Sequence, residues 1–159
     1  MSERSAHIIS AFRSIVSPRG GDLARFKPYE LAAPIVKKLI HHAGLEADQI
    51  DEIIVSNALW ASGNPARLVA LASGLPERVA GLSIDRQCCG GLDALGLAQA
   101  MIQSGHAEAI IAGGVESYSQ RPVRLRNDHC AAPTIAYDQP PFAPTADQDP
   151  NMAEAADRI

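Results

Sequence analysis

Hydrophobic positions along the chain follow two patterns, one typical of strands and one typical of helices. Short runs rich in Ile, Val and Ala indicate strands, and the segments between them have apolar residues spaced three or four apart, as in helices. The predicted strands are residues 6–12, 51–56, 79–84 and 109–114. The predicted helices begin near Pro28, at Asn64-Pro65 and after Cys88.

This alternation predicts an α/β fold with a mainly parallel sheet and helices on both faces, because strands separated by helices are joined by right-handed crossovers. The strand at 109–114 is apolar at consecutive positions, as expected of a strand covered on both sides. Pro34 interrupts the first helix, which either begins again there or kinks. The helix after Cys88 carries few polar residues, so we expect it to be buried.

The chain divides into three parts by composition. Residues 1–119 form the predicted α/β core. Residues 120–150 contain six of the eleven prolines and lose hydrophobic periodicity, which indicates a loop excursion. Residues 151–159 resume a helical pattern, and we expect the chain to end inside the fold, partway through that helix.

Composition limits which binding partners and which cellular compartment are expected for the protein. The 159 residues are 47% hydrophobic and carry a formal net charge of −4, so nucleic acid is not an expected partner. No apolar run reaches the roughly 18 residues of a membrane span, and the N-terminus lacks a secretory signal, which predicts a cytoplasmic protein. Three cysteines with two adjacent, and the neighbouring His41 and His42, match no disulfide framework or metal spacing. We therefore expect no metal site and no membrane contact.

The strongest candidate for chemistry is Cys88, at the junction between a predicted strand and a predicted helix. A thiol at that turn receives the exposed N–H groups and the positive end of the helix dipole, which favour thiolate. Gly90 and Gly91 each cost roughly 1 kcal/mol relative to alanine in a helix, and they fit a close approach of backbone or substrate. The alternative is a buried pair, Cys88 and Cys89, packed at the helix start. The local pattern leaves both interpretations open.

Four motifs, in order, resemble those of a known family. They are residues 9–13 with Gly20-Gly21, residues 63–67 (Gly-Asn-Pro-Ala-Arg), Arg86-Gln87-Cys88 with Gly91-Leu92, and residues 111–117 (Ile-Ala-Gly-Gly-Val-Glu-Ser). Over residues 6–119 the chain resembles the N-terminal half of a thiolase. The resemblance implies a layered half-fold that pairs with a similar second half, with a helix layer between two stacked α/β units.

The resemblance also implies the chemistry. Cys88 would accept the acyl group of an acyl-coenzyme A or a 3-ketoacyl-coenzyme A, and its backbone N–H would form part of an oxyanion hole. Coenzyme A thioesters are then substrates, and no resident cofactor is expected. Cys89 replaces a smaller or hydroxylated residue and is expected to point toward packing. His129 and Cys130 do not match the family's histidine and second cysteine, which belong to its other half.

Turnover is therefore expected to need a missing C-terminal half, and the expected partners are an acyl-coenzyme A and either a second copy of the chain or a complementary C-terminal-half chain. Two alternatives without catalysis are an inactive truncated fragment and a pairing subunit. A third is condensing activity like that of the ketoacyl synthases, which share the fold. It rests on Asp85, which stands where thiolases usually have asparagine and which opposes thiolate formation when ionised. The sequence does not select an acyl chain length or a direction of reaction.

Overall fold

The computed structural model describes residues 4–60, 63–127 and 134–159. The chain forms two compact units, Met1–Pro122 and Val123–Ile159. The first holds the sheet and the longer helices, and the second holds short elements. Among the described residues, no helix has the length and hydrophobicity needed to cross a bilayer.

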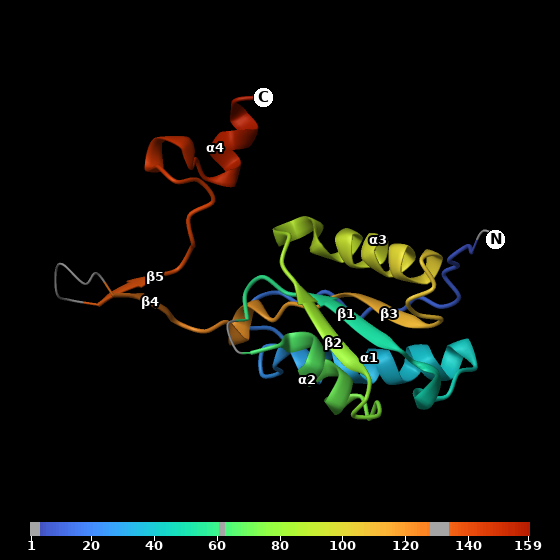
Figure 1. The fold of residues 1–159 in the computed structure, drawn as a ribbon. Coiled ribbons are helices and arrows are strands. Elements are labelled where there is room, and N and C mark those ends of the chain that lie inside the picture. The colour runs from blue at the N-terminus through green and yellow to red at the C-terminus, as the bar shows by residue number, and fades with distance from the viewer. Residues whose placement is uncertain (1–3, 61–62, 128–133) are drawn as a thin grey trace. The chain divides into compact units, whose positions relative to one another are not determined.

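The first unit has three layers, helices covering both faces of a central sheet (Figure 1). Three parallel strands lie in the order β2-β1-β3, and their bounds are Glu52–Ser56 for β1, Ala80–Ile84 for β2 and Ile110–Gly114 for β3. Helices α1 (Pro28–Ala43) and α2 (Pro65–Ala72) cover one face, and α3 (Gly90–Gln103) covers the other. Single 3₁₀ turns occupy Ala47–Gln49, Gln87–Cys89 and Tyr118–Gln120. The predicted α/β fold with a parallel sheet is confirmed.

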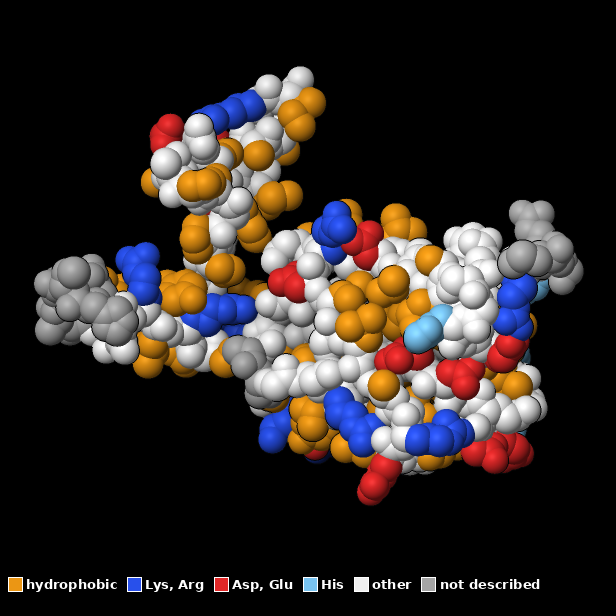
Figure 2. Space-filling model, viewed as in Figure 1, with side chains coloured by type: hydrophobic (Ala, Val, Ile, Leu, Met, Phe, Trp, Pro, Cys, Tyr) orange, Lys and Arg blue, Asp and Glu red, His pale blue; other side chains and the backbone are white. Residues whose placement is uncertain are grey.

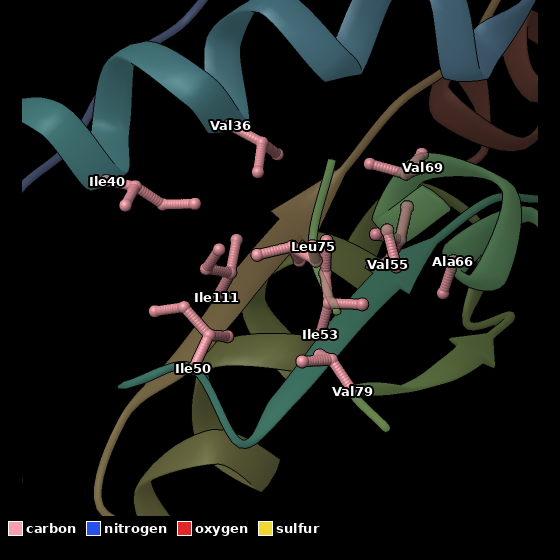
Figure 3. Close-up of a cluster of buried hydrophobic side chains, with 11 residues drawn as sticks. Val36, Ile40, Ile50, Ile53, Val55, Ala66, Val69, Leu75, Val79 and Ile111 are labelled. Carbon is pink, nitrogen blue, oxygen red and sulfur yellow. The ribbon is translucent and has the colours of Figure 1, made fainter. Parts of the chain in front are cut away.

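The main hydrophobic core lies between the sheet and α1 and α2 (Figure 3). Its fully buried members include Ile53 on the central strand and Val69 on α2. Helix α1 contributes Val36 and Ile40, which lie one turn apart and point at the sheet. The helix does not begin again at Pro34 but continues through it, because the burial of this face stabilises one long helix and Pro34 itself is exposed.

The core on the α3 side is smaller. Its buried members are Ile54 of β1 and Ala94 and Ala98 of α3. The expectation that α3 is buried is therefore wrong for this chain, since only the face that meets the sheet is covered. Leu92 on the outer face is 73% exposed and Leu95 is 43% exposed.

The predicted first strand, residues 6–12, is also wrong. The segment has no strand pairing, and Ile8 and Ile9 are exposed. Arg4 forms an ion pair with Glu108 before β3, and the Gly20 N–H donates to Ser119 Oγ (3.0 Å) beyond it, so the segment follows β3 from end to end. A strand requires a hydrogen-bonded neighbour, and β3 pairs only with β1 among the described residues. The sheet consequently has three strands where four were expected.

The second unit contains a short antiparallel pair, β4 (Arg124–Arg126) and β5 (Ile135–Tyr137). It also contains a 3₁₀ turn at Ala146–Gln148 and helix α4 (Met152–Asp157). The Asn151 side chain caps α4 by accepting a hydrogen bond from the Glu154 N–H (2.9 Å). Apolar side chains of this unit are largely exposed, among them Leu125 and Phe142.

Candidate active site

The turn that carries Cys88 joins the end of β2 to the start of α3, as the sequence predicts. The Asp85 carboxylate shapes it by accepting hydrogen bonds from the Gln87 backbone N–H (2.8 Å) and from the Gln87 side-chain amide (3.3 Å). Gln87 has a φ of 49°, and no other non-glycine residue described has a positive φ. Such a conformation is costly for a side chain with a Cβ, so Asp85 stabilises the sharp bend that precedes Cys88.

A second contact ties this turn to the helix that follows. The Arg86 Nε lies 2.8 Å from the Asp93 carboxylate in the first turn of α3. Both side chains are substantially exposed, so the pair orients the turn more than it stabilises the fold. The two residues before Gln87, Asp85 and Arg86, are thus each held by a hydrogen bond or an ion pair.

Gly90 brings the start of α3 against the end of β1. A Cβ built at Gly90 would lie 1.7 Å from Ser56 Oγ, a separation that no side chain tolerates. Around Gly91, in contrast, a Cβ would meet nothing within 4 Å. The close backbone approach predicted for the two glycines is therefore present at Gly90, and at Gly91 the space is open.

Both cysteines at the turn are exposed free thiols. Cys88 lies in the 3₁₀ turn directly before α3, so its thiol is open to solvent next to the helix start. The expectation that Cys89 points toward packing is wrong. The 3₁₀ turn places both residues outside the contact between α3 and the sheet, which begins at Gly90. The local alternative of a packed cysteine pair is excluded for this chain.

A polar network joins the ends of β1 and β3 at the sheet edge where Cys88 lies. The Asn57 side-chain amide donates to the Val115 carbonyl (2.7 Å) and to Glu116 Oε2 (3.1 Å). The Ala58 N–H donates to Glu116 Oε1 (2.5 Å), and the Asn57 N–H donates to the Ile84 carbonyl at the end of β2 (3.1 Å). Asn57 therefore connects all three strands at this edge.

Sequence reasoning did not identify Asn57. The available signal was a polar residue directly after a buried strand, because the carboxyl ends of parallel strands meet at one edge and ligands bind there. Glu116 belongs to the motif at residues 111–117, from which no role for this side chain could be predicted. The network shows that it holds the backbone after β1.

The Asn-Pro-Ala-Arg motif has a structural role. Asn64 caps α2 by accepting from the Arg67 N–H (3.0 Å), and its amide donates to the Gly81 carbonyl on β2 (2.5 Å). The Arg67 guanidinium donates to the Val79 carbonyl (2.6 Å). A Cβ at Gly81 would lie 2.4 Å from the Arg67 nitrogen, so this glycine permits the contact. The motif fixes α2 against β2, the strand that leads to Cys88.

The remaining candidates lie elsewhere. His129 and Cys130 fall outside the described residues. His42 Nδ1 lies 3.1 Å from Ser10 Oγ, and its ring meets Phe12 edge-on, 5.1 Å between centroids. Within the described parts of the chain, no three His, Cys, Asp or Glu side chains gather where a metal could bind.

Comparison with known proteins identifies the family. The model of the thiolase N-terminal domain matches residues 6–139. The chain belongs to the thiolase family. As a thiolase-family chain it resembles "Putative acetyl-CoA C-acetyltransferase YhfS" of Bacillus subtilis, at 43% identity over 153 residues, which cover 96% of the chain and 38% of that protein. "Putative acetyl-CoA C-acetyltransferase VraB" of Staphylococcus aureus is 33% identical over 157 residues, 97% of the chain and 41% of that protein.

A solved structure has the same fold. The crystal structure of the Bacillus anthracis acetyl-CoA acetyltransferase superimposes with a TM-score of 0.75 at 36% identity, over 79% of this chain and 33% of that one. The thiolase-family chain therefore spans less than half the length of the relatives it matches. The resemblance of the sequence to a thiolase N-terminal half is confirmed.

Proposed function

We propose that this chain carries the acyl-accepting half of a thiolase-type acyltransferase. Cys88 attacks the carbonyl carbon of an acyl-coenzyme A or a 3-ketoacyl-coenzyme A, its sulfur forms a thioester with the acyl group, and the leaving group departs. From an acyl-coenzyme A the leaving group is the coenzyme A thiolate. From a 3-ketoacyl-coenzyme A it is the acetyl-coenzyme A carbanion, which takes up a proton. Coenzyme A thioesters are substrates in this proposal, and no resident cofactor is required.

The observation that carries the proposal is the exposed Cys88 thiol at the turn before α3, within the segment that matches the thiolase N-terminal domain. Its backbone N–H, at the start of the helical segment, is our candidate for one donor to the thioester oxygen. The network around Asn57 supports this function by holding the strand ends at the same edge. Rigid surroundings matter because catalysis depends on a fixed geometry between nucleophile and carbonyl.

Turnover needs a general base or acid in addition to the nucleophile. We propose that it comes from the remainder of the thiolase fold, in a complementary C-terminal half or in a second copy of the chain. One open surface supports this partnership, the outer side of α3. Hydrophobic side chains gather on the exposed surface between α3 and β2 (Figure 2). Apolar patches of this kind mark interaction surfaces.

The test is mass spectrometry after incubation with acetyl-coenzyme A. We expect an acetyl adduct on the peptide containing Cys88 that is absent from a Cys88→Ser variant, with little release of product by the isolated chain. An unmodified Cys88 in folded protein would refute acyl transfer and leave the non-catalytic interpretations, a fragment or a pairing subunit.

Asp85→Asn provides a matched control. The amide oxygen can still accept the Gln87 N–H, but the negative charge near Cys88 is removed. We expect iodoacetamide to label Cys88 a few-fold faster, because a nearby anion disfavours thiolate. Asp85→Ala removes the charge and the hydrogen bond together. The difference in labelling rate between the two variants therefore measures how much the Asp85–Gln87 hydrogen bond contributes to the reactivity of Cys88.

We further propose a cytoplasmic location and a role in fatty acid metabolism. Two adjacent exposed thiols suit a reducing compartment, because oxidising compartments convert such cysteines to disulfides. Coenzyme A thioester chemistry of the proposed kind acts on acyl chains. The chain can be incubated with acyl-coenzyme A substrates of increasing acyl length. The substrate that forms the adduct on Cys88 fastest identifies the preferred acyl group.

A further inference from the structure

Cys89 is a second exposed thiol beside the proposed nucleophile, and the proposed acyl transfer does not use it. Neither cysteine is in a disulfide. The α-carbons of adjacent residues are only about 3.8 Å apart, so the two sulfur atoms stay close in space in any conformation of the chain. No tertiary rearrangement or partner is needed to bring them together.

The local backbone opposes direct contact between the sulfurs. Adjacent side chains on a helical turn point in different directions, so closing a bond between them requires the 3₁₀ turn to open. That turn is a single one, with the Cys89 N–H donating to the Arg86 carbonyl (3.1 Å). It begins at Gln87, the non-glycine residue with positive φ, and Gly90, which lies against Ser56, directly follows it. A bond formed there is strained and hence readily reduced.

We propose that Cys89 is a resolving thiol that protects Cys88 from irreversible oxidation. A hydroperoxide accepts the attack of the Cys88 thiolate, the peroxide O–O bond breaks, and Cys88 becomes a sulfenic acid with release of water or alcohol. The Cys89 thiol then attacks the Cys88 sulfur, a disulfide forms between the adjacent residues, and the sulfenic oxygen leaves as water. A thiol reductant restores both thiols. Without Cys89, further peroxide converts Cys88 to sulfinic acid, which thiols do not reverse.

The test uses hydrogen peroxide and compares the chain with its Cys89→Ser variant, both in a Cys130→Ser background that removes the third cysteine. Trypsin places Cys88 and Cys89 on one peptide, residues 87–124, so their oxidation states are read together. With Cys89 present we expect this peptide to lose two hydrogen atoms and to regain them after dithiothreitol. In Cys89→Ser we expect sulfinic acid at Cys88 to accumulate on the order of tenfold faster.

Two outcomes overturn the proposal. One is sulfinic acid at Cys88 forming at the same rate with and without Cys89. The other is a disulfide between two chains as the main oxidation product. If Cys89→Ser fails to fold, as judged by circular dichroism, Cys89→Ala serves the same comparison. The result is independent of acyl transfer, because the redox readout uses no coenzyme A and a chain that never forms an acyl adduct can still form the disulfide.

Discussion

The two faces of the sheet differ in how completely this chain covers them. On one face, α1 and α2 enclose a core of large branched side chains that includes Ile53 and Val69, both fully buried (Figure 3). On the other face, α3 buries two alanines against Ile54 and leaves Leu92 and Leu95 exposed. The chain stabilises its own fold mainly from the first face and leaves the outer side of α3 on the second face exposed.

The composition of α3 fits this division. Its buried positions are small, so the helix lies close to the sheet, and its three leucines are exposed. A Cβ at Gly96 would meet nothing within 4 Å, so this position leaves room at the outer surface. Small residues among leucines allow a second helix to approach closely. The Cys88 turn leads directly into this helix, so a partner that covers α3 also lies next to the candidate site.

The largest effect expected is a loss of stability when the closed face is truncated. Ile53→Ala removes a fully buried side chain and should lower the free energy of unfolding by about 2–5 kcal/mol. Leu92→Ala, the matched change on the open face, should alter it by less than about 0.5 kcal/mol, because Leu92 is 73% exposed. Urea denaturation followed by circular dichroism measures both. Equal losses would show that the two faces are equally packed in solution.

The next change tests the contact between α3 and the sheet. Gly90→Ala places a methyl group where Ser56 Oγ now lies and should destabilise the chain by about 1–3 kcal/mol. Gly91→Ala meets open space and should be neutral or stabilising by up to about 1 kcal/mol, since alanine favours a helix. Thermal melts of the pair provide the comparison. A Gly90→Ala chain as stable as the native one would mean that the helix start does not lie against β1.

A third change tests the hydrogen bonds between the segments that precede β1 and β3. Asp51 accepts hydrogen bonds from the Glu108 N–H (2.7 Å) and the Ala109 N–H (3.1 Å), and these bonds hold the pKa of its carboxyl below the ordinary value. Asp51→Ala should therefore cost about 1 kcal/mol at neutral pH, a modest figure because the group is largely solvated.

The sign of the pH dependence follows from that lowered pKa. The stability contributed by Asp51 is present above its unfolded pKa, near 3.8, and is lost as the pH falls through the lower folded value. Burial raises the pKa of Glu52, which acts in the opposite sense and weakens the fold as the pH rises through that value. Subtracting the unfolding profile of Asp51→Ala from that of the native chain isolates the first effect. A difference that persists unchanged below pH 3 would contradict this assignment.

Local patterns in the sequence predicted most elements correctly because the signals lay within single segments. The strands at Ile53 and Ile111, the cap at Asn64 and the turn at Cys88 each follow from residues close in sequence. The failure at residues 6–12 has the opposite cause. Ile8 and Ile9 have strand-forming side chains, but pairing depends on a neighbour that the described chain does not supply.

The site was predicted in part for the same reason. The position of the candidate residue Cys88, at a turn before a helix, could be predicted from nearby residues, whereas the Asn57 network joins positions 27 to 59 residues apart in sequence. The exposure of Cys89 could not be predicted either, since a pair of cysteines at a helix start is compatible with burial or solvent. Only the contact at Gly90 decides where the packed part of the helix begins.

The smallest effect on stability, and the sharpest test of the open face, is expected from charge on α3. The double variant Leu92→Glu, Leu95→Glu should unfold within about 0.5 kcal/mol of the native chain, because both side chains are solvent-accessible. Association should change instead. We expect the native chain to bind an apolar dye and to form oligomers by light scattering, and the double variant to lose both properties, since a charged surface cannot be desolvated against a partner. Lys37→Glu and Lys38→Glu together, on the exposed side of α1, alter the charge in the same direction without touching α3 and should leave association intact. A native chain that is monomeric and binds no dye would show that the exposed leucines of α3 are not an interaction surface.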